Sequence, residues 1–187
     1  MSKLPHGAGV ASAWVQRWSH LIKAGGSVLD LACGQGRHMR HLHAKGFQCL
    51  GVDRDATALE VAQNFGAVLH ADVENQAWPL TGAQFDAVVV TNYLWRPLWP
   101  QLLDSLKPGG VLIYETFSVG NETVGKPSNP NFLLGNGELL EVCQSLRVVA
   151  FEDGFLDEPA RFVQRIVAVQ NGLPADASDA PVPYLLA

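Results

Sequence analysis

Cysteine is scarce in this sequence, with only Cys33, Cys49 and Cys143 among 187 residues. Their number is odd, they are widely spaced, and no two of them form a C-x-x-C pair. A disulfide framework or a structural zinc site needs paired or closely spaced cysteines. The sequence therefore argues against both kinds of site and fits a reducing compartment.

Long apolar runs are also missing. No stretch of about 18 uncharged apolar residues occurs, so the sequence predicts no transmembrane helix. The opening segment MSKLPHGAGVASAWVQRW has no apolar core of the kind that signal peptides carry. We therefore expect a cytoplasmic protein that does not associate with a membrane.

Positive charge is in short supply. The 13 lysines and arginines face 18 aspartates and glutamates, which gives a formal net charge of -5. Nucleic-acid-binding proteins usually carry a basic face, because phosphate contacts supply most of their nonspecific affinity. A small-molecule partner is therefore favoured over a nucleic acid, which stays open as a second possibility. Monomer and homodimer are both compatible with the sequence.

The apolar pattern alternates between the period of a strand and that of a helix. Strands are expected at 27–32, 47–53, 67–72, 85–92 and 110–117, and helices at 12–23, 36–45, from 55 onwards, 96–106 and 137–145. Two further β-rich stretches, 147–153 and 161–169, suggest a terminal hairpin that makes one strand antiparallel. The fold class is therefore α/β, with a doubly wound and mostly parallel sheet. We expect one domain over 1–170 and a flexible tail over 171–187.

A polar side chain stands at the end of five consecutive expected strands. These residues are Asp30, Asp53, Asp72, Asn92 and the pair Glu115-Thr116. In open α/β sheets the ligand binds beyond the carboxyl ends of the strands. The series therefore predicts a ligand site at that edge of the sheet.

The stretch VLDLACGQGRHMRHL, residues 28–42, reads as a strand, a glycine turn and a helix. It lacks the third glycine of the dinucleotide fingerprint G-x-G-x-x-G, since Met39 stands at that position. No Gly-Lys-Ser/Thr of a phosphate-binding P-loop occurs either. Asp30, just ahead of the turn, would repel a pyrophosphate and favour a ligand with a cationic amine.

Two later carboxylates extend this interpretation. Asp53, 17 residues after Gly36, can accept hydrogen bonds from both hydroxyls of a ribose. Asp72 could accept a hydrogen bond from an exocyclic amine such as that of adenine. A cationic amino-acid end, a ribose and an adenine together describe S-adenosylmethionine better than NAD.

The pattern DLACGQGR at 30–37, with Asp53, Ala71-Asp72 and LKPGGVLIYETF, resembles class I S-adenosylmethionine-dependent methyltransferases. Within them it is most similar to small bacterial tellurite-resistance and small-molecule methyltransferases, over roughly residues 11–169. The resemblance implies a Rossmann-like seven-stranded sheet of order 3-2-1-4-5-7-6 with strand 7 antiparallel. Ala32 stands where the family often has glycine.

The resemblance also implies roles for individual residues. Ala32, Gly34 and Gly36 would line the methionine part of the cofactor, with Asp30 and Arg37 beside them. Asp53 would hold the ribose, Arg54, Asp72 and Val73 would lie around the adenine, and Asn92 and Tyr93 would be the catalytic candidates near the sulfonium and the acceptor.

The acceptor site is expected at NYLWRPLW, residues 92–99, and in the long loop 118–132. The loop exceeds the usual length of a structureless connection, which favours a lid or a binding loop over a mobile excursion. Candidate substrate residues are Trp95, Arg96, Glu115 and Asn121. Trp95 and Trp99 could equally pack the core, Arg96 could be a surface arginine, and Glu115 is either a base or only a strand-end carboxylate.

Three histidines lie close together in sequence at 38, 41 and 43. On a helix His38 and His41 share a face, whereas His43 points elsewhere. No carboxylate pattern accompanies them, so we expect a solvated helix face and no metal site.

The favoured function is methyl transfer from S-adenosylmethionine to a small-molecule acceptor by in-line displacement, with S-adenosylhomocysteine as the product. An Asn/Asp-Pro-Pro-Tyr/Phe motif and a Pro-Cys nucleophile are both missing, which points away from DNA bases. The alternatives are an RNA or protein methyltransferase and a noncatalytic module that binds the cofactor. An NAD-dependent reductase is the least favoured, because Met39 replaces the third glycine.

Overall fold

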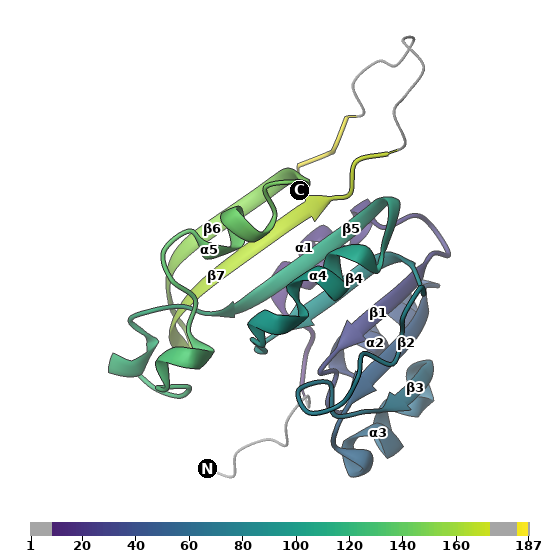
Figure 1. Ribbon diagram of the computed structural model, residues 1–187, viewed down its shortest axis with the longest axis horizontal. Helices are drawn as coiled ribbons and strands as arrows, with labels where there is room; N and C mark the ends of the chain where they lie inside the picture. The colour runs from purple at the N-terminus through teal and green to yellow at the C-terminus, as the bar shows by residue number, and fades with distance from the viewer. Residues whose placement is uncertain (1–8, 173–182, 187) are drawn as a thin grey trace.

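A computed structural model describes residues 9–172 and 183–186, which contain one seven-stranded sheet (Figure 1). The strands are β1 (Ser27–Leu31), β2 (Gln48–Asp53), β3 (Ala67–His70), β4 (Phe85–Thr91), β5 (Leu106–Phe117), β6 (Arg147–Asp157) and β7 (Ala160–Val169). Their order is β3-β2-β1-β4-β5-β7-β6, and β7 runs antiparallel to both of its neighbours. The predicted α/β class, strand order and antiparallel seventh strand are confirmed.

Helices cover both faces of the sheet. They are α1 (Ala13–Trp18), α2 (Arg37–Ala44), α3 (Ala56–Ala62), α4 (Trp99–Asp104) and α5 (Glu138–Val142), with short 3-10 turns at Ser19–Leu21, Gln63–Phe65, Arg96–Leu98, Asn121–Thr123 and Pro130–Phe132. Buried side chains of α1, α2 and α3 share one hydrophobic cluster, and those of α4 and α5 belong to a second. The sheet therefore separates two cores, as a doubly wound fold requires.

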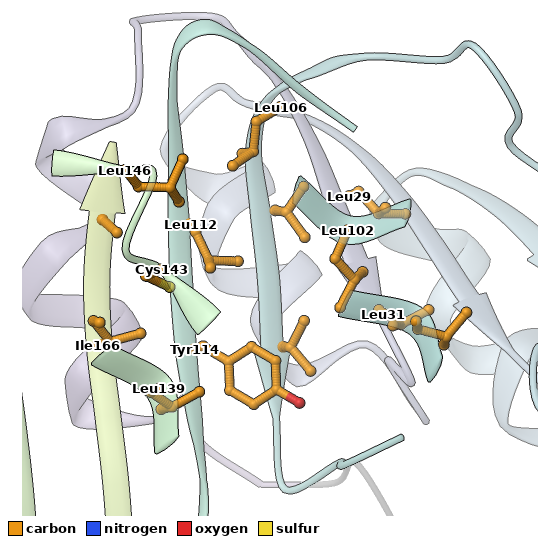
Figure 2. Close-up of a cluster of buried hydrophobic side chains, with 14 of the residues drawn as sticks. Leu29, Leu31, Leu102, Leu106, Leu112, Tyr114, Leu139, Cys143, Leu146 and Ile166 are labelled. Carbon is orange, nitrogen blue, oxygen red and sulfur yellow. The ribbon is translucent and has the colours of Figure 1, made fainter. Parts of the chain in front are cut away.

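The continuous apolar run of β4 follows from this arrangement. Val88 and Val90 face the cluster of α4 and α5, whereas Ala87 and Val89 face that of α1 to α3, and all four are fully buried. Figure 2 shows the cluster of α4 and α5, in which Leu112 and Tyr114 of β5 lie among Leu102, Leu139 and Ile166. A strand that is buried on both faces loses the alternation of apolar and polar residues.

The first expected helix is shorter in the structure. It begins after Ser12, whose hydroxyl accepts a hydrogen bond from the backbone N–H of Trp14 at 3.1 Å. Regular helix ends at Trp18 and continues as one 3-10 turn, because Ile22 adopts an extended conformation and is buried in the core.

The strand expected at 110–117 begins four residues earlier in the structure. β5 begins at Leu106, which pairs with Phe85, and the next recorded partners are Ala87 and Val111. Between these pairs β5 has four residues and β4 has one, and the three extra residues form an irregularity that the strand tolerates, with Gly109 at a φ of 76°. Other boundaries also moved: the helix expected at 96–106 starts as a 3-10 turn, α5 ends at Val142, and β6 continues to Asp157.

No helix among the described residues combines the length and apolarity needed to cross a bilayer. Most of the predicted tail lies outside the described residues, as do residues 1–8. Of its described part, the ring of Tyr184 lies 4.7 Å from the Arg147 guanidinium, and the carbonyl of Leu185 lies 3.0 Å from Nε2 of His20. The division into a domain and a tail stays a prediction.

Candidate cofactor and acceptor site

A cavity of about 540 Å³ opens at the carboxyl edge of the parallel strands. Residues that end or follow β1, β2, β3, β4 and β5 form its walls, and two residues of the 118–132 loop close one side. The lining residues are Leu31, Ala32, Val52, Asp53, Arg54, Asp55, Ala71, Asp72, Val73, Glu74, Asn92, Tyr93, Leu94, Thr116, Phe117, Pro127 and Phe132. Seven of the residues predicted to bind the cofactor or to catalyse therefore line one cavity: Ala32, Asp53, Arg54, Asp72, Val73, Asn92 and Tyr93.

The glycine turn adopts left-handed backbone conformations at Ala32, Gly34 and Gly36, with φ of 54°, 53° and 74°. Glycine adopts such angles without strain, whereas Ala32 does so at some cost. A Cβ on Gly36 would also lie 3.0 Å from the backbone of Ala62 in α3. The two glycines therefore let the chain turn sharply and let α2 and α3 pack closely.

Met39 explains how this turn works without a third glycine. Its side chain is fully buried and packs against Gly51 of β2. A Cβ added to Gly51 would lie only 2.5 Å from the Met39 sulfur, so only glycine fits there. The close contact between helix and strand is thus made by a glycine on the strand rather than on the helix. In the dinucleotide fingerprint the helix itself carries that glycine.

Asp53 organises the turn and also faces the cavity. One of its carboxylate oxygens accepts a 2.7 Å hydrogen bond from the N–H of Gly34, and the other accepts one of 2.9 Å from the N–H of Asp55. Each oxygen of an ionised carboxylate can accept more than one hydrogen bond. Asp53 therefore holds β2 to the turn and still has acceptor capacity for a ligand.

Asp30 is almost completely buried at the start of the turn. Its Oδ2 has no hydrogen-bond partner within the described part of the chain, and Nδ1 of His38 lies 3.8 Å away. Burial raises the pKa of Asp30 to about 7, although Arg37 works in the opposite direction. Burial, with Arg37, lowers the pKa of His38 to about 3, so this imidazole is neutral near pH 7. The backbone N–H of Met39 donates a hydrogen bond to the carboxyl of Asp30, which leaves Oδ2 as the oxygen suited to a cationic partner.

One end of the cavity carries Arg54, Asp72, Glu74 and Tyr93. The side chains of Arg54 and Glu74 pair at 3.8 Å, and Asp72 caps the following turn by accepting from the N–H of Glu74. A hydrogen bond from the side chain of Asn75 holds the pKa of Asp72 below its ordinary value.

Tyr93 lies beside this group. Burial, with the nearby Glu74, raises the pKa of Tyr93. Its hydroxyl is buried and has no hydrogen-bond partner among the described residues. Asn92 has a left-handed φ of 54°, and its N–H donates to the carbonyl of Glu115 at 2.9 Å. This strained residue joins the ends of β4 and β5 at the opposite end of the cavity from Arg54.

The 118–132 loop has a defined structure. The amide of Asn121 is buried, donates to the carbonyl of Pro127 at 3.0 Å and accepts from the N–H of Phe162 at 3.3 Å. A backbone bridge between Ser118 and Leu134 joins the two ends of the loop. The side chain of Asn121 is thus engaged within the protein, whereas Pro127 and Phe132 line the cavity.

Arg96 also holds this loop. Its guanidinium donates two hydrogen bonds to Glu138 of α5, at 2.6 and 2.8 Å, and one each to the carbonyls of Asn131 and Leu133, both at 2.9 Å. Trp95 packs against the core cluster, and the ring of Trp99 lies 5.2 Å from that of Tyr114. These contacts fit the packing alternative for the two tryptophans.

Replacing Arg96 with alanine should loosen the loop without unfolding the protein. The substitution removes four hydrogen bonds, but water screens the pair because 40% of the Arg96 side chain is exposed. We therefore expect a loss of about 1–2 kcal/mol of unfolding free energy. Hydrogen exchange should accelerate at the N–H groups of Phe132 and Leu133. Arg40→Ala, which removes one hydrogen bond to the carbonyl of Gly9, is the control; equal exchange in the two variants would contradict the anchoring role.

Glu115 does not line the cavity. It is 1% exposed and belongs to an ionic network on the α1 face of the sheet. The Ser12 hydroxyl donates to it at 3.0 Å, Arg165 donates at 3.3 Å, and Arg161 lies 3.9 Å away. Arg161 has no local sequence signal that would link it to Glu115, because it lies in β7, far along the chain from the glycine turn.

Within residues 9–172 and 183–186, no three histidine, cysteine or carboxylate side chains gather in a metal-binding arrangement. His38 is 1% exposed and faces Asp30 rather than solvent. The expected solvated helix face therefore does not include His38.

Residues 28–110 match the protein family described as a methyltransferase domain. The chain is 31% identical to a tRNA U34 carboxymethyltransferase of Klebsiella pneumoniae over 176 residues, which are 81% of this chain and 52% of that protein. It spans about half the length of the curated relatives that it matches.

Solved structures share the fold at low sequence identity. TehB from Haemophilus influenzae superposes with a TM-score of 0.67 at 19% identity, over 82% of this chain and 60% of that one. A SAM-dependent methyltransferase from Methanosarcina mazei gives 0.66 at 13% identity, over 88% of this chain and 100% of that one. The match over residues 28–110 and the shared seven-stranded architecture support a class I S-adenosylmethionine-dependent methyltransferase.

Proposed function

We propose that the chain binds S-adenosylmethionine in the cavity and transfers its methyl group to a small-molecule acceptor, leaving S-adenosylhomocysteine. One observation carries the proposal. Ala32, Asp53, Asp72 and Asn92 follow four different strands, β1 to β4, and all four line one cavity of about 540 Å³. That volume lies in the usual range for a drug-sized or cofactor-sized ligand.

The polar groups divide the cavity into two ends. Asp53 is suited to accept from the ribose hydroxyls, and the group around Asp72 to contact the adenine. Because the hydroxyl of Tyr93 lies near Glu74 and Asp72, we assign Tyr93 to the adenine end rather than to the acceptor. Asn92 lies toward β5, where the methyl group would emerge. Asp30, behind the turn, is suited to the ammonium of the methionine part.

The bound cofactor supplies a methyl group on a sulfonium, whose thioether leaves without needing a proton. The protein therefore has to position the acceptor and exclude water, and it needs no acid for the leaving group. Leu94, Phe117 and Phe132 give the cavity apolar walls that suit this task. Arg96 and Asn121 support the loop that brings Phe132 there, and we assign them a structural role.

Calorimetry with the full chain tests the binding step. We expect S-adenosylmethionine and S-adenosylhomocysteine to bind at micromolar concentrations and NAD to bind far more weakly. An absence of adenosyl-ligand binding at millimolar concentration would overturn the proposal.

A second acceptor class is RNA, and a specific observation favours it. The relative that matches 81% of this chain is named as a tRNA-modifying enzyme. Incubation with labelled S-adenosylmethionine and a cell extract separates the two classes. Label in the small-molecule fraction supports the main proposal, whereas label confined to RNA assigns the second.

A further inference from the structure

Four arginines gather around two glutamates on the α1 face of the sheet. The arginines are Arg17, Arg37, Arg161 and Arg165, and the glutamates are Glu115 and Glu152. Asp30 also acts on Arg37, so four arginines face three carboxylates here, in a chain whose formal net charge is -5. Such a local excess of buried or half-buried cations indicates a missing anion.

Two of the arginines are already neutralised. Arg165 contacts Glu152 at 2.5 Å and Glu115 at 3.3 Å, and its guanidinium lies 4.8 Å from the centre of the Trp14 ring. Arg17 pairs with the other oxygen of Glu152 at 3.5 Å. The hydroxyl of Ser12 donates a further hydrogen bond to Glu115. This part of the network fastens α1 to the sheet.

Arg37 and Arg161 have fewer hydrogen bonds and weaker ion pairs than Arg165. Nη2 of Arg37 donates a hydrogen bond of 3.3 Å to the Thr91 hydroxyl. Arg161 approaches Glu115 only at 3.9 Å, and its buried Nε has no hydrogen-bond partner among the described residues. A guanidinium carries five N–H donors, so several are available on each residue. Leaving a buried donor unpaired is costly unless a ligand or water satisfies it.

The two arginines contact residues near the carboxyl ends of β4 and β5 on the α1 face of the sheet. Thr91, the partner of Arg37, directly precedes Asn92, and Glu115, the neighbour of Arg161, directly precedes Thr116; both Asn92 and Thr116 line the cavity. Glu115 and Arg161 also act electrostatically on Arg37, so the three groups form one cluster. The cluster therefore lies on the α1 face near the carboxyl ends of β4 and β5, and neither arginine is among the residues that line the cavity.

Resting on the proposed function, we propose that Arg37 and Arg161 form a carboxylate subsite that anchors the acidic group of a small-molecule acceptor. Guanidinium groups match carboxylates in geometry and charge. The side chain of Arg161 is only 23% exposed, so the subsite suits a small acid better than a nucleic-acid backbone, which needs a broad exposed basic face. The anchored carboxylate positions the acceptor and is not itself methylated.

The α-carboxylate of the cofactor has the same chemistry, so the experiment separates the two sources. Its first arm measures binding of S-adenosylhomocysteine and of 5′-methylthioadenosine, which lacks the amino-acid part. Its second arm measures binding of acetate, malonate and benzoate to the protein loaded with S-adenosylhomocysteine, by saturation-transfer NMR, against acetamide, malonamide and benzamide. Both arms use the full chain, Arg37→Gln, Arg161→Gln and, as the control on the same helix as Arg37, Arg40→Gln.

The proposal predicts that at least one carboxylate binds better than its amide. Arg37→Gln and Arg161→Gln should weaken that binding at least tenfold, and Arg40→Gln should leave it unchanged. Arg161→Gln, which changes no residue expected to contact the cofactor, should change S-adenosylhomocysteine affinity less than threefold. Two results overturn it: no preference for carboxylates in the wild type, or weakened binding of S-adenosylhomocysteine but not of methylthioadenosine, which would assign the arginines to the cofactor. If the wild type does not bind S-adenosylhomocysteine at all, the proposed function fails first, and the subsite fails with it.

Discussion

Asp53→Ala should weaken binding of S-adenosylhomocysteine about a hundredfold or more. The substitution removes the acceptor expected for both ribose hydroxyls, and a hydrogen bond to a charged group contributes about 1.5–3 kcal/mol. It also frees the N–H of Gly34, which now donates to Asp53 at 2.7 Å, so the glycine turn loses its tie to β2. Calorimetry at pH 7.5 measures the loss directly.

Two further variants separate these effects. Asp53→Asn keeps a carbonyl oxygen for the turn but loses the charge and one acceptor, so it should fall between the wild type and Asp53→Ala. Asp104→Ala changes an exposed carboxylate at the end of α4 and should bind normally. If Asp53→Ala melts like the wild type and binds with wild-type affinity, the ribose assignment is wrong.

Binding of S-adenosylhomocysteine should also weaken as the pH falls below 7, by up to tenfold per pH unit. The pKa of Asp30 is about 7 in the free protein, so its carboxyl is increasingly protonated below that pH. A ligand ammonium binds the ionised form, which means that binding lowers this pKa and releases a proton. Calorimetry between pH 5.5 and 8, in buffers of different ionisation enthalpy, measures both the affinity and the released protons.

Asp30→Asn is the matched variant, because it keeps the shape of the side chain and removes its titration. It should bind more weakly at pH 8 and show a much flatter pH profile. Arg37, His38, Cys33 and Asp53 surround this group, and the pKa values of His38 and Cys33 lie outside the tested range. A wild-type profile that stays flat, or one that Asp30→Asn reproduces, would contradict the role of Asp30.

Much of the fold could be predicted from the sequence, because apolar runs and glycine turns are local signals. Five strands and the glycine turn lie close to their expected positions. The predicted ends of helices and strands were wrong where tertiary contacts determine them. Burial of Ile22 ends α1 early, and pairing of Leu106 with Phe85 makes Leu106 the first residue of β5. Neither contact has a signature in the neighbouring sequence.

The site divides in the same way. Strand-end residues such as Asp53 and Asn92 could be predicted to lie together, since parallel strands bring their carboxyl ends to one edge. The partners of Arg96 and Asn121 could not, because they depend on the path of the loop. Arg161 could not be predicted either: it reaches Glu115 only because β7 runs antiparallel beside β5.

The loop that supplies Pro127 and Phe132 starts and ends at one place, where Ser118 pairs with Leu134. The contacts assigned to the cofactor come from the ends of the strands, and residues 119–133 contribute none of them. This segment can therefore be replaced by another loop between the same two end points. The Arg96–Glu138 pair, which holds the loop, should then be kept. Loops of different sequence at this position should change which acceptor is methylated while the residues assigned to the cofactor stay the same.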